Sequence, residues 1–335
     1  MQDYTTVDYH TGGEPFRIVT GGAAVPEGAR VIDRREAAQQ GELDNIRALL
    51  CNEPRGHPDM YGGFLVPPDD EGADLGVLFW HNAGFSTACG HGTIALATYA
   101  VDEGLVDAPA DGEAEVVIDV PSGRVRALVQ REGGRVVGVT FVNVPSYVLA
   151  RRVPLDTPFG PLQVDISYGG AVYASVRASL AGLTLQSRDL SVLIQLGRTV
   201  KDLLRDHEAT RHPSDVRLSG VYGVIWWEPR RSADGVVHQR SCTVFADGEV
   251  DRSPSGSGTS ARLALLHDDG TVAVGEPFLH DSILGSRFVG RVLEKTTSDD
   301  KVAVITQVEG SAFRTGEHRF MLDPLDPFEK GFLLR

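Results

Sequence analysis

The chain has few of the residues that mark several protein classes. Its 335 residues include three cysteines, an odd number at wide spacing, and they show neither a signal-peptide pattern nor a long apolar run. This excludes a disulfide-rich secreted scaffold and favours a reduced, cytoplasmic protein. His10, His57, His81 and His91 fall at no ligand spacing such as H-x-x-x-H, and the cysteines have no C-x-x-C partner, so no metal is expected.

Positive charge is also scarce. The chain has 32 Lys and Arg against 46 Asp and Glu, a formal net charge of −14, and no sequence cluster of Lys and Arg offsets it locally. A nucleic acid or an anionic membrane is therefore not an expected partner. The length suits two domains of about 150 residues, and 41% hydrophobic residues supply a sizeable core.

Two glycine-rich turns in different halves of the chain resemble each other. Residues 88–93 open an apolar run over 94–101, residues 254–259 open another over 260–267, and the stretches align without a gap at an offset of 166 residues. We infer an old duplication in which each half carries one glycine-rich turn entering one helix. The paired identities are Gly90/Gly256, Gly92/Gly258, Thr93/Thr259, Ala95/Ala261, Asp102/Asp268 and Gly104/Gly270.

Such turns suit anion binding. The first N–H groups of a helix lack partners within it and lie at the positive end of its dipole, so two turns could hold a small carboxylate. The same field favours the thiolate of Cys89, since a free thiol has a pKa of about 8.5. The alternative is that both turns are ordinary helix entries and Cys89 is a small buried side chain. The equivalent position in the second turn is Ser255.

The remaining pattern predicts a strand-rich chain with few helices. A polar loop is expected over 52–62, a domain boundary over 145–154, and a tail from 318 that packs back on the body. Helices are expected over 34–50, with Gly41 as a weak position, and from about Asp189, as N-cap, to 208. Strands are expected at 4–9, 16–20, 75–80, 116–120, 125–129, 136–142, 162–167, 171–176, 221–227, 237–245, 288–293 and 302–308.

Two generic motifs fit poorly. Residues 256–261 match G-x-G-x-x-A, but the chain lacks alternating βαβ units, and Asp268 comes too early to bind a ribose. Neither Ser255 nor Ser257 lies in the G-x-S-x-G motif of serine hydrolases.

A set of motifs spread nearly end to end resembles the proline racemase family. The resemblance implies an α/β fold like that of diaminopimelate epimerase, with two pseudo-symmetric domains, each a curved, mostly antiparallel sheet around a central helix, and a site in the cleft between them. The expected domains are 1–148, joined by the tail 318–335 and carrying Cys89, and 149–317, carrying Ser255. The motifs are Asp8-Tyr9-His10-Thr11-Gly12-Gly13-Glu14-Pro15, Glu53-Pro54-Arg55-Gly56-His57, Cys89-Gly90-His91-Gly92-Thr93, Tyr168-Gly169-Gly170 and Asp251-Arg252-Ser253-Pro254-Ser255-Gly256-Ser257-Gly258-Thr259.

The resemblance also implies roles for particular residues. Asp251 and His91 would contact the ring nitrogen of the substrate, and Tyr61 and Phe245 would wall the ring, although aromatic residues near strand ends are often core. The substrate carboxylate would be bound by the backbone amides of Gly90, His91, Gly256 and Ser257.

The pair Cys89 and Ser255 decides the expected reaction. Family racemases and 4-hydroxyproline epimerases carry two cysteines here, and a serine hydroxyl, which titrates far above neutral pH, is a poor replacement. Members with a hydroxyl residue resemble the trans-3-hydroxy-L-proline dehydratases, although their usual residue is Thr. The expectation is a lyase in which Cys89 removes the α-proton and water is eliminated to give 1-pyrroline-2-carboxylate.

Two alternatives stay open. Within the family they are 4-hydroxyproline 2-epimerase and proline racemase, both isomerases; outside it, the alternative is a non-enzymatic amino-acid-binding protein. The expected partner is hydroxyproline or proline, no cofactor is expected, and a homodimer is one candidate assembly. Cys51 and Cys242 lie outside the turns and are expected to be dispensable for catalysis.

Overall fold

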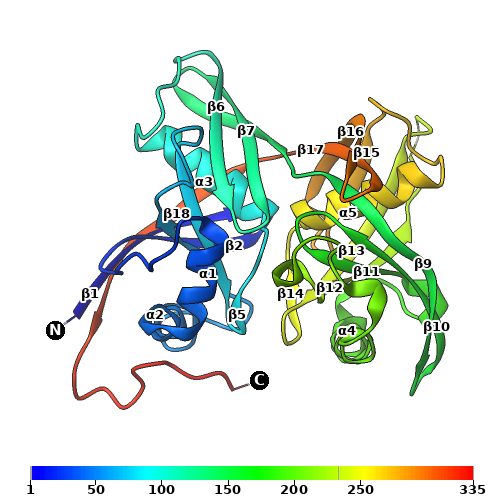
Figure 1. The fold of residues 1–335 in the computed structure, drawn as a ribbon, viewed down its shortest axis with the longest axis horizontal. Helices are drawn as coiled ribbons and strands as arrows, with labels where there is room; N and C mark the ends of the chain where they lie inside the picture. Colours follow the sequence, from blue (N-terminus) through cyan, green and yellow to red (C-terminus); the bar gives the residue numbers. More distant parts are fainter. Residues whose placement is uncertain (1, 233, 335) are drawn as a thin grey trace. The chain divides into compact units, whose positions relative to one another are not determined.

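The computed structural model describes residues 2–232 and 234–334. The chain divides into two compact units, residues 1–139 with 311–335 and residues 140–310. Each unit is a strand-rich body with one helix buried among its strands (Figure 1). Every helix in the described ranges is too short or too polar to span a membrane.

The first unit begins with a hairpin and ends with a strand from the C-terminal part of the chain. Its sheet runs in the order β18, β1, β2, β3, β4, β6, β7, with parallel pairing only at β2·β3 and β4·β6 among these steps. The elements are β1 Gln2–Thr11, β2 Glu14–Gly21, α1 Val31–Gln40, α2 Glu42–Cys51, β3 Tyr61–Val66, β4 Leu75–His81, β5 Gly84–Phe85, α3 Gly90–Asp102, β6 Gly112–Val120, β7 Gly123–Glu132, β8 Arg135–Val142, which ends just past the boundary, and β18 Ala312–Leu322.

The second unit forms a closed ring of strands. The order is β9, β10, β11, β12, β13, β15, β16, β17 and back to β9, with parallel pairing at β11·β12 and β13·β15. The elements are β9 Ser146–Thr157, β10 Gly160–Tyr168, β11 Val172–Arg177, η1 Ala178–Ala181, η2 Ser187–Asp189, α4 Leu190–Leu204, η3 Glu208–Thr210, η4 Val216–Leu218, β12 Val221–Pro229, β13 Val237–Phe245, β14 Glu249–Asp251, α5 Gly256–Asp268, β15 Phe278–Asp281, β16 Arg287–Ser298 and β17 Lys301–Gly310.

The two units repeat the same order of elements. Helices α3 and α5 are both 13 residues long and begin 166 residues apart, at Gly90 and Gly256. The same offset separates the starts of β6 and β15, of β8 and β17, and of β9 and β18. Both helices are followed, one residue past the C-cap, by a glycine with positive φ, +68° at Gly104 and +77° at Gly270. This repeated order is what the predicted duplication would leave in the element boundaries.

The central helices are buried on all sides. Residues 90–101 of α3 and 256–266 of α5 are all buried, as expected of a helix without a polar face. Helix α3 contacts β1, β2, β6, β7 and β18, and α5 contacts β9, β10, β11, β16 and β17. By contrast, α4 buries one stripe against β12 and β13, formed by Leu193, Leu196, Gly197, Val200 and Leu204.

Some element predictions are wrong in detail. The helix predicted over 34–50 is two helices, α1 and α2, which meet at Gly41. The loop predicted over 52–62 ends early, because Tyr61 begins β3. Asp189 stands at the N-cap of α4 but makes no capping bond, since its carboxylate accepts from the Thr184 backbone and hydroxyl instead.

The strands β9 and β18 were not predicted. The expected boundary at 148/149 falls inside β9, and the expected start of the tail at 318 falls inside β18. Each strand begins soon after the chain passes from one unit into the other, and pairs with a strand of the unit it has entered, β9 with β10 and β18 with β1. Residues 318–322 of the tail pack back on the body as the end of β18, and further along Phe332 forms an isolated bridge with Glu53.

Candidate functional site

The first glycine-rich turn places Cys89 as the N-cap of α3. Its Sγ accepts a hydrogen bond of 3.1 Å from the N–H of Gly92, and its carbonyl accepts one of 2.8 Å from the Thr93 hydroxyl. Gly92 is required here because a Cβ would lie 2.4 Å from the Phe16 ring and 2.8 Å from Sγ. By helix geometry, the N–H groups of Gly90 and His91 come before the first that can bond within the helix.

Aromatic rings surround His91 beside this thiol. Its ring nitrogens lie 3.4 and 3.5 Å from Cys89 Sγ, and Tyr61 packs edge-on at 4.8 Å between centroids, with Phe16 at 5.9 Å. Burial lowers the pKa of His91 to about 3, so the imidazole is neutral. The Tyr61 hydroxyl is 2.5 Å from Ser86 Oγ, which fixes the ring beside the turn.

The second turn places Ser255 as the N-cap of α5. Its hydroxyl accepts from the N–H of Gly258 at 3.3 Å, and its carbonyl accepts from the Thr259 hydroxyl at 2.6 Å. The N–H groups of Gly256 and Ser257 occupy the same helical positions as those of Gly90 and His91. The two turns therefore have the same capping pattern, with a thiol in one and a hydroxyl in the other.

Asp251 is held beside Ser255 by a chain of hydrogen bonds. Ser253 donates to Asp251 Oδ1 from its backbone N–H at 2.8 Å and from its hydroxyl at 2.7 Å, and the Ser253 hydroxyl accepts from Ser255 N–H at 3.0 Å. Burial raises the pKa of Asp251 to about 6, against the hydrogen bonds from Ser253 and Ser255, which lower it. This carboxyl therefore titrates close to neutral pH.

Aromatic residues connect Phe245 to the second turn. Phe245, at the end of β13, stacks on Tyr222 at 5.7 Å, and Tyr222 packs edge-on against Tyr173 at the same centroid distance. The Tyr173 hydroxyl is 2.7 Å from Ser257 Oγ. Phe245 and Tyr61 are both buried, at 2% and 1% exposure.

The predicted site residues thus form one group in each unit. Tyr61 and His91 lie at Cys89, Asp251 lies at Ser255, and Phe245 is linked to Ser257 by ring contacts. Sequence reasoning assigned no role to Phe16, Ser86, Ser253 or Tyr173. Of these, Ser253 lies within a family motif and could have been found, whereas Tyr173 carries no sequence signal.

The other two cysteines are buried outside the turns. Cys51 Sγ contacts the carbonyl of Met60 at 3.4 Å, and burial raises the pKa of Cys242 to about 12. Cys242 therefore stays protonated and is unsuited to act as a base. Within the described ranges, no three His, Cys, Asp or Glu side chains gather as a metal site would require.

Comparison with known proteins places the chain in a family. The family profile described as proline racemase matches residues 6–333. A trans-3-hydroxy-L-proline dehydratase of Bacillus thuringiensis subsp. konkukian is 42% identical over 331 residues, covering 99% of this chain and 98% of that protein. A 3-hydroxyproline 2-epimerase of Burkholderia multivorans is 44% identical over 332 residues, with the same coverage.

A solved structure agrees with these relatives. The crystal structure of a hydroxyproline epimerase from Agrobacterium vitis, with bound trans-4-hydroxy-L-proline, has a TM-score of 0.92 and 31% identity, and covers 99% of this chain and 96% of that chain. The expected α/β fold of the diaminopimelate-epimerase type is confirmed. The relatives are lyases and isomerases, so the chain is an enzyme and the binding-protein alternative is set aside. From residue 6 to residue 333, this chain belongs to the proline racemase family.

Proposed function

We propose that this enzyme is a trans-3-hydroxy-L-proline dehydratase. The observation that carries the proposal is the difference between two equivalent N-caps, a thiol at Cys89 and a hydroxyl at Ser255. Racemisation needs a base and an acid on opposite faces of the ring, and a serine hydroxyl suits neither role near neutral pH. The relative from Bacillus thuringiensis supports the same reaction.

Substrate binding rests on the two helix starts. The N–H groups of Gly90 and His91, and those of Gly256 and Ser257, are the donors for the substrate carboxylate. Asp251 and neutral His91 contact the ring nitrogen, because a carboxylate and an imidazole can both accept from a ring ammonium. Tyr61 and Phe245 wall the ring. Sequence resemblance and the grouping around each turn support these roles.

The Cys89 thiolate is the base. The start of a helix favours a thiolate, and the Gly92 N–H that bonds to Sγ stabilises its negative charge. The thiolate takes the α-proton, and the charge left on the substrate spreads into a carboxylate held by backbone N–H groups. Because His91 is neutral, it supplies no positive charge to this intermediate. The backbone N–H donors therefore provide the stabilisation.

Elimination then needs no second base. In the trans-3-hydroxy-L isomer the hydroxyl lies opposite the carboxylate and on the same ring face as the α-hydrogen. The C3–O bond breaks as the double bond forms, and the proton taken by Cys89 passes to the departing hydroxide to give water. The enamine product tautomerises to 1-pyrroline-2-carboxylate, and the thiolate is restored.

Epimerisation at C2 is the second candidate. It is favoured by the 3-hydroxyproline 2-epimerase of Burkholderia multivorans at 44% identity, and by the Agrobacterium vitis structure with bound trans-4-hydroxy-L-proline. Sequence resemblance suggests 4-hydroxyproline or proline as the substrate for this alternative, whereas the name of the Burkholderia relative gives 3-hydroxyproline. This alternative requires a proton donor at the second turn, which Ser255 would have to supply.

One experiment separates the two reactions. Purified protein is incubated with trans-3-hydroxy-L-proline, trans-4-hydroxy-L-proline and L-proline, while imine is followed with o-aminobenzaldehyde and configuration by optical rotation. We expect imine from the 3-hydroxy substrate and no rapid change of rotation with the other two. Rotation that changes with trans-4-hydroxy-L-proline, without imine from the 3-hydroxy isomer, would replace the dehydratase with the epimerase.

A further inference from the structure

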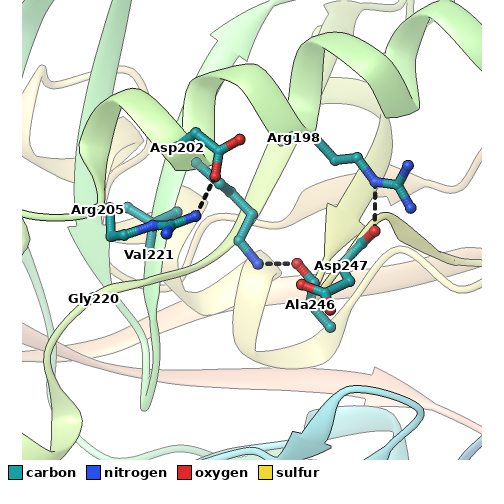
Figure 2. Close-up of a pocket in the computed structure, with 8 residues that line it drawn as sticks. Arg198, Asp202, Arg205, Gly220, Val221, Ala246 and Asp247 are labelled. Atoms are coloured by element: carbon teal, nitrogen blue, oxygen red, sulfur yellow. Dashed lines mark hydrogen bonds and ion pairs between the residues drawn. The ribbon is translucent and has the colours of Figure 1, made fainter.

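A cavity in the second unit lies apart from the residues described above. It has a volume of about 460 Å³ and is bounded by α4, by the start of β12 at Gly220 and Val221, and by the turn that joins β13 to β14 (Figure 2). None of the residues proposed to contact substrate is among those lining it. Its chemistry therefore needs a separate explanation.

Three cationic side chains on one face of α4 and its C-cap line this cavity. Arg198, Lys201 and Arg205 are spaced three and four residues apart, so a helix brings them to the same side. The three residues are dispersed in sequence, and only the helical period gathers them.

The cations differ in how far they are already paired. Arg205 forms an exposed ion pair with Asp202 at 2.5 Å, at 73% and 65% side-chain exposure. Lys201 Nζ donates to the carbonyl of Ala246, and Arg198 Nε donates to the carbonyl of Asp247 at 2.5 Å (Figure 2). A guanidinium has five N–H donors, and among the described residues no partner is found for the outer nitrogens of Arg198.

The incompletely bonded donors of Arg198 and Lys201, rather than the net charge of the cavity, suit a small anion. The lining has three cations against the carboxylates of Asp202 and Asp247, and Glu249 also acts on Lys201 from nearby. Burial lowers the pKa of Lys201, which means that its charge is under-solvated and would be stabilised by an anion. An arginine fork beside an ammonium is the usual way to bind phosphate or carboxylate oxygens.

We propose that this cavity binds a small dianion, an inorganic or organic phosphate or a dicarboxylate, through Arg198 and Lys201, and that its occupancy is coupled to the candidate site. The carbonyls that these two cations hold belong to Ala246 and Asp247. These residues follow Phe245 directly and precede β14, which ends at Asp251. The coupling half of the proposal rests on the proposed function, and the binding half does not.

Close packing gives the turn little freedom to move independently of α4. A Cβ on Gly197 would lie 2.9 Å from Val244, and one on Gly248 would lie 2.4 Å from Arg198 Nε. Ala246 has φ of +45°, a conformation that non-glycine residues seldom adopt. An anion that draws Arg198 or Lys201 away from the carbonyls of Asp247 and Ala246 therefore weakens hydrogen bonds that hold Ala246 in this conformation.

Binding is tested by calorimetry with inorganic phosphate and with succinate. We expect saturable binding of at least one of them, which identifies the ligand chemistry, and a Kd at least about tenfold higher in Arg198→Gln, because charge-assisted hydrogen bonds are lost. Arg188→Gln, an exposed cation outside the cavity at 72% side-chain exposure, is the matched control and should bind like wild type. Absence of saturable binding, or equal affinity in all three proteins, overturns the site.

Coupling is tested without turnover. Pyrrole-2-carboxylate, a planar mimic of the deprotonated ring, is titrated with and without phosphate or succinate, and the reverse titration is also made. Linkage requires the same factor in both directions, and we expect at least about fivefold. A factor of one overturns the coupling. Failure of pyrrole-2-carboxylate to bind, with anion binding intact, contradicts the proposed function instead and leaves the anion site standing.

Discussion

The two glycine-rich turns share a capping pattern but differ in the backbone that enters it. Cys89 has φ of −154° and ψ of 105°, an extended conformation, whereas Ser255 has φ of +66° and ψ of 112°. Positive φ at a non-glycine residue costs free energy and persists only where the surroundings enforce it. At Ser255 three hydrogen bonds hold the residue: its N–H donates to the Ser253 hydroxyl, its hydroxyl accepts from Gly258 N–H, and its carbonyl accepts from the Thr259 hydroxyl.

The residues that surround the two turns also differ in chemical character. The thiol lies beside Phe16, Tyr61 and His91, which are rings, whereas the hydroxyl lies in a network that includes Ser253 and Asp251. At the 166-residue offset, Asp251 corresponds to Phe85. Duplication thus preserved the helix start that can bind an anion, while the flanking residues changed the chemistry each N-cap can perform.

The largest expected effect is the loss of the thiol. Cys89→Ser should lower kcat for dehydration by at least about 10²- to 10⁴-fold, because a positioned base is removed. Binding of pyrrole-2-carboxylate by calorimetry should be largely unchanged, since the backbone donors remain. Cys242→Ala, at a buried cysteine outside the turns, is the control and should keep its kcat. Turnover that survives in Cys89→Ser would remove the proposed mechanism.

Making the two turns alike is the next test. Ser255→Cys places a thiol at the second helix start, where the helix dipole favours the thiolate as at Cys89. We expect inversion of L-proline to rise at least about tenfold over wild type; a well-placed proton donor gives about 10²- to 10⁴-fold, but a misplacement of about 1 Å forfeits much of this.

The readout is deuterium at the α-position, together with accumulation of D-proline. Wild type should exchange with retention and the variant with inversion, while dehydration of the 3-hydroxy substrate persists. Exchange without inversion in Ser255→Cys would contradict a place for residue 255 at the substrate ring.

The second turn has a buried carboxyl beside it, Asp251, and this group should make the free energy of unfolding depend on pH. The pKa of Asp251 is about 6 in the folded protein, above the unfolded value of about 3.9, so the folded state holds the proton more tightly. Stability from this group is present below pH 4 and is lost as pH rises to about 6, by about 3 kcal/mol. Asp251→Asn should lack this fall.

The free energy of unfolding of wild type and of Asp251→Asn is measured with urea at several pH values between 4 and 8. Subtracting one protein's pH dependence from the other's cancels the contribution of the other titrating groups. If the free energy of unfolding changed equally with pH in the two proteins, the pKa of Asp251 would not be raised on folding.

The smallest expected difference compares two matched threonines. The hydroxyls of Thr93 and Thr259 both donate to the N-cap carbonyl, but only Thr259 also contacts His280, at 2.8 Å from Nδ1. Thr93→Val should cost about 1 kcal/mol in urea unfolding, and Thr259→Val about 1–3 kcal/mol, because buried His280 loses its partner as well. Equal losses would show that the His280 contact contributes nothing to stability.

Local sequence predicted the elements whose pattern is regular. The starts of α3 and α5 follow from glycines and N-caps, and most strands follow from alternating or continuous apolar runs. The strand β9 was missed because Arg151, Arg152 and Pro154 resemble a linker, and β18 because four of its eleven residues are charged or histidine. Both are strands because they pair with β10 and β1, contacts that local sequence does not encode.

The site divides in the same way. Sequence alone determined that one N-cap is a thiol and the other a hydroxyl, since both lie in short motifs repeated at a fixed offset. Tertiary structure decided that His91 is neutral, that Asp251 titrates near pH 6, and that Tyr173 reaches Ser257. Burial and partners far along the chain set these properties, and both arise only when the strands close around each helix.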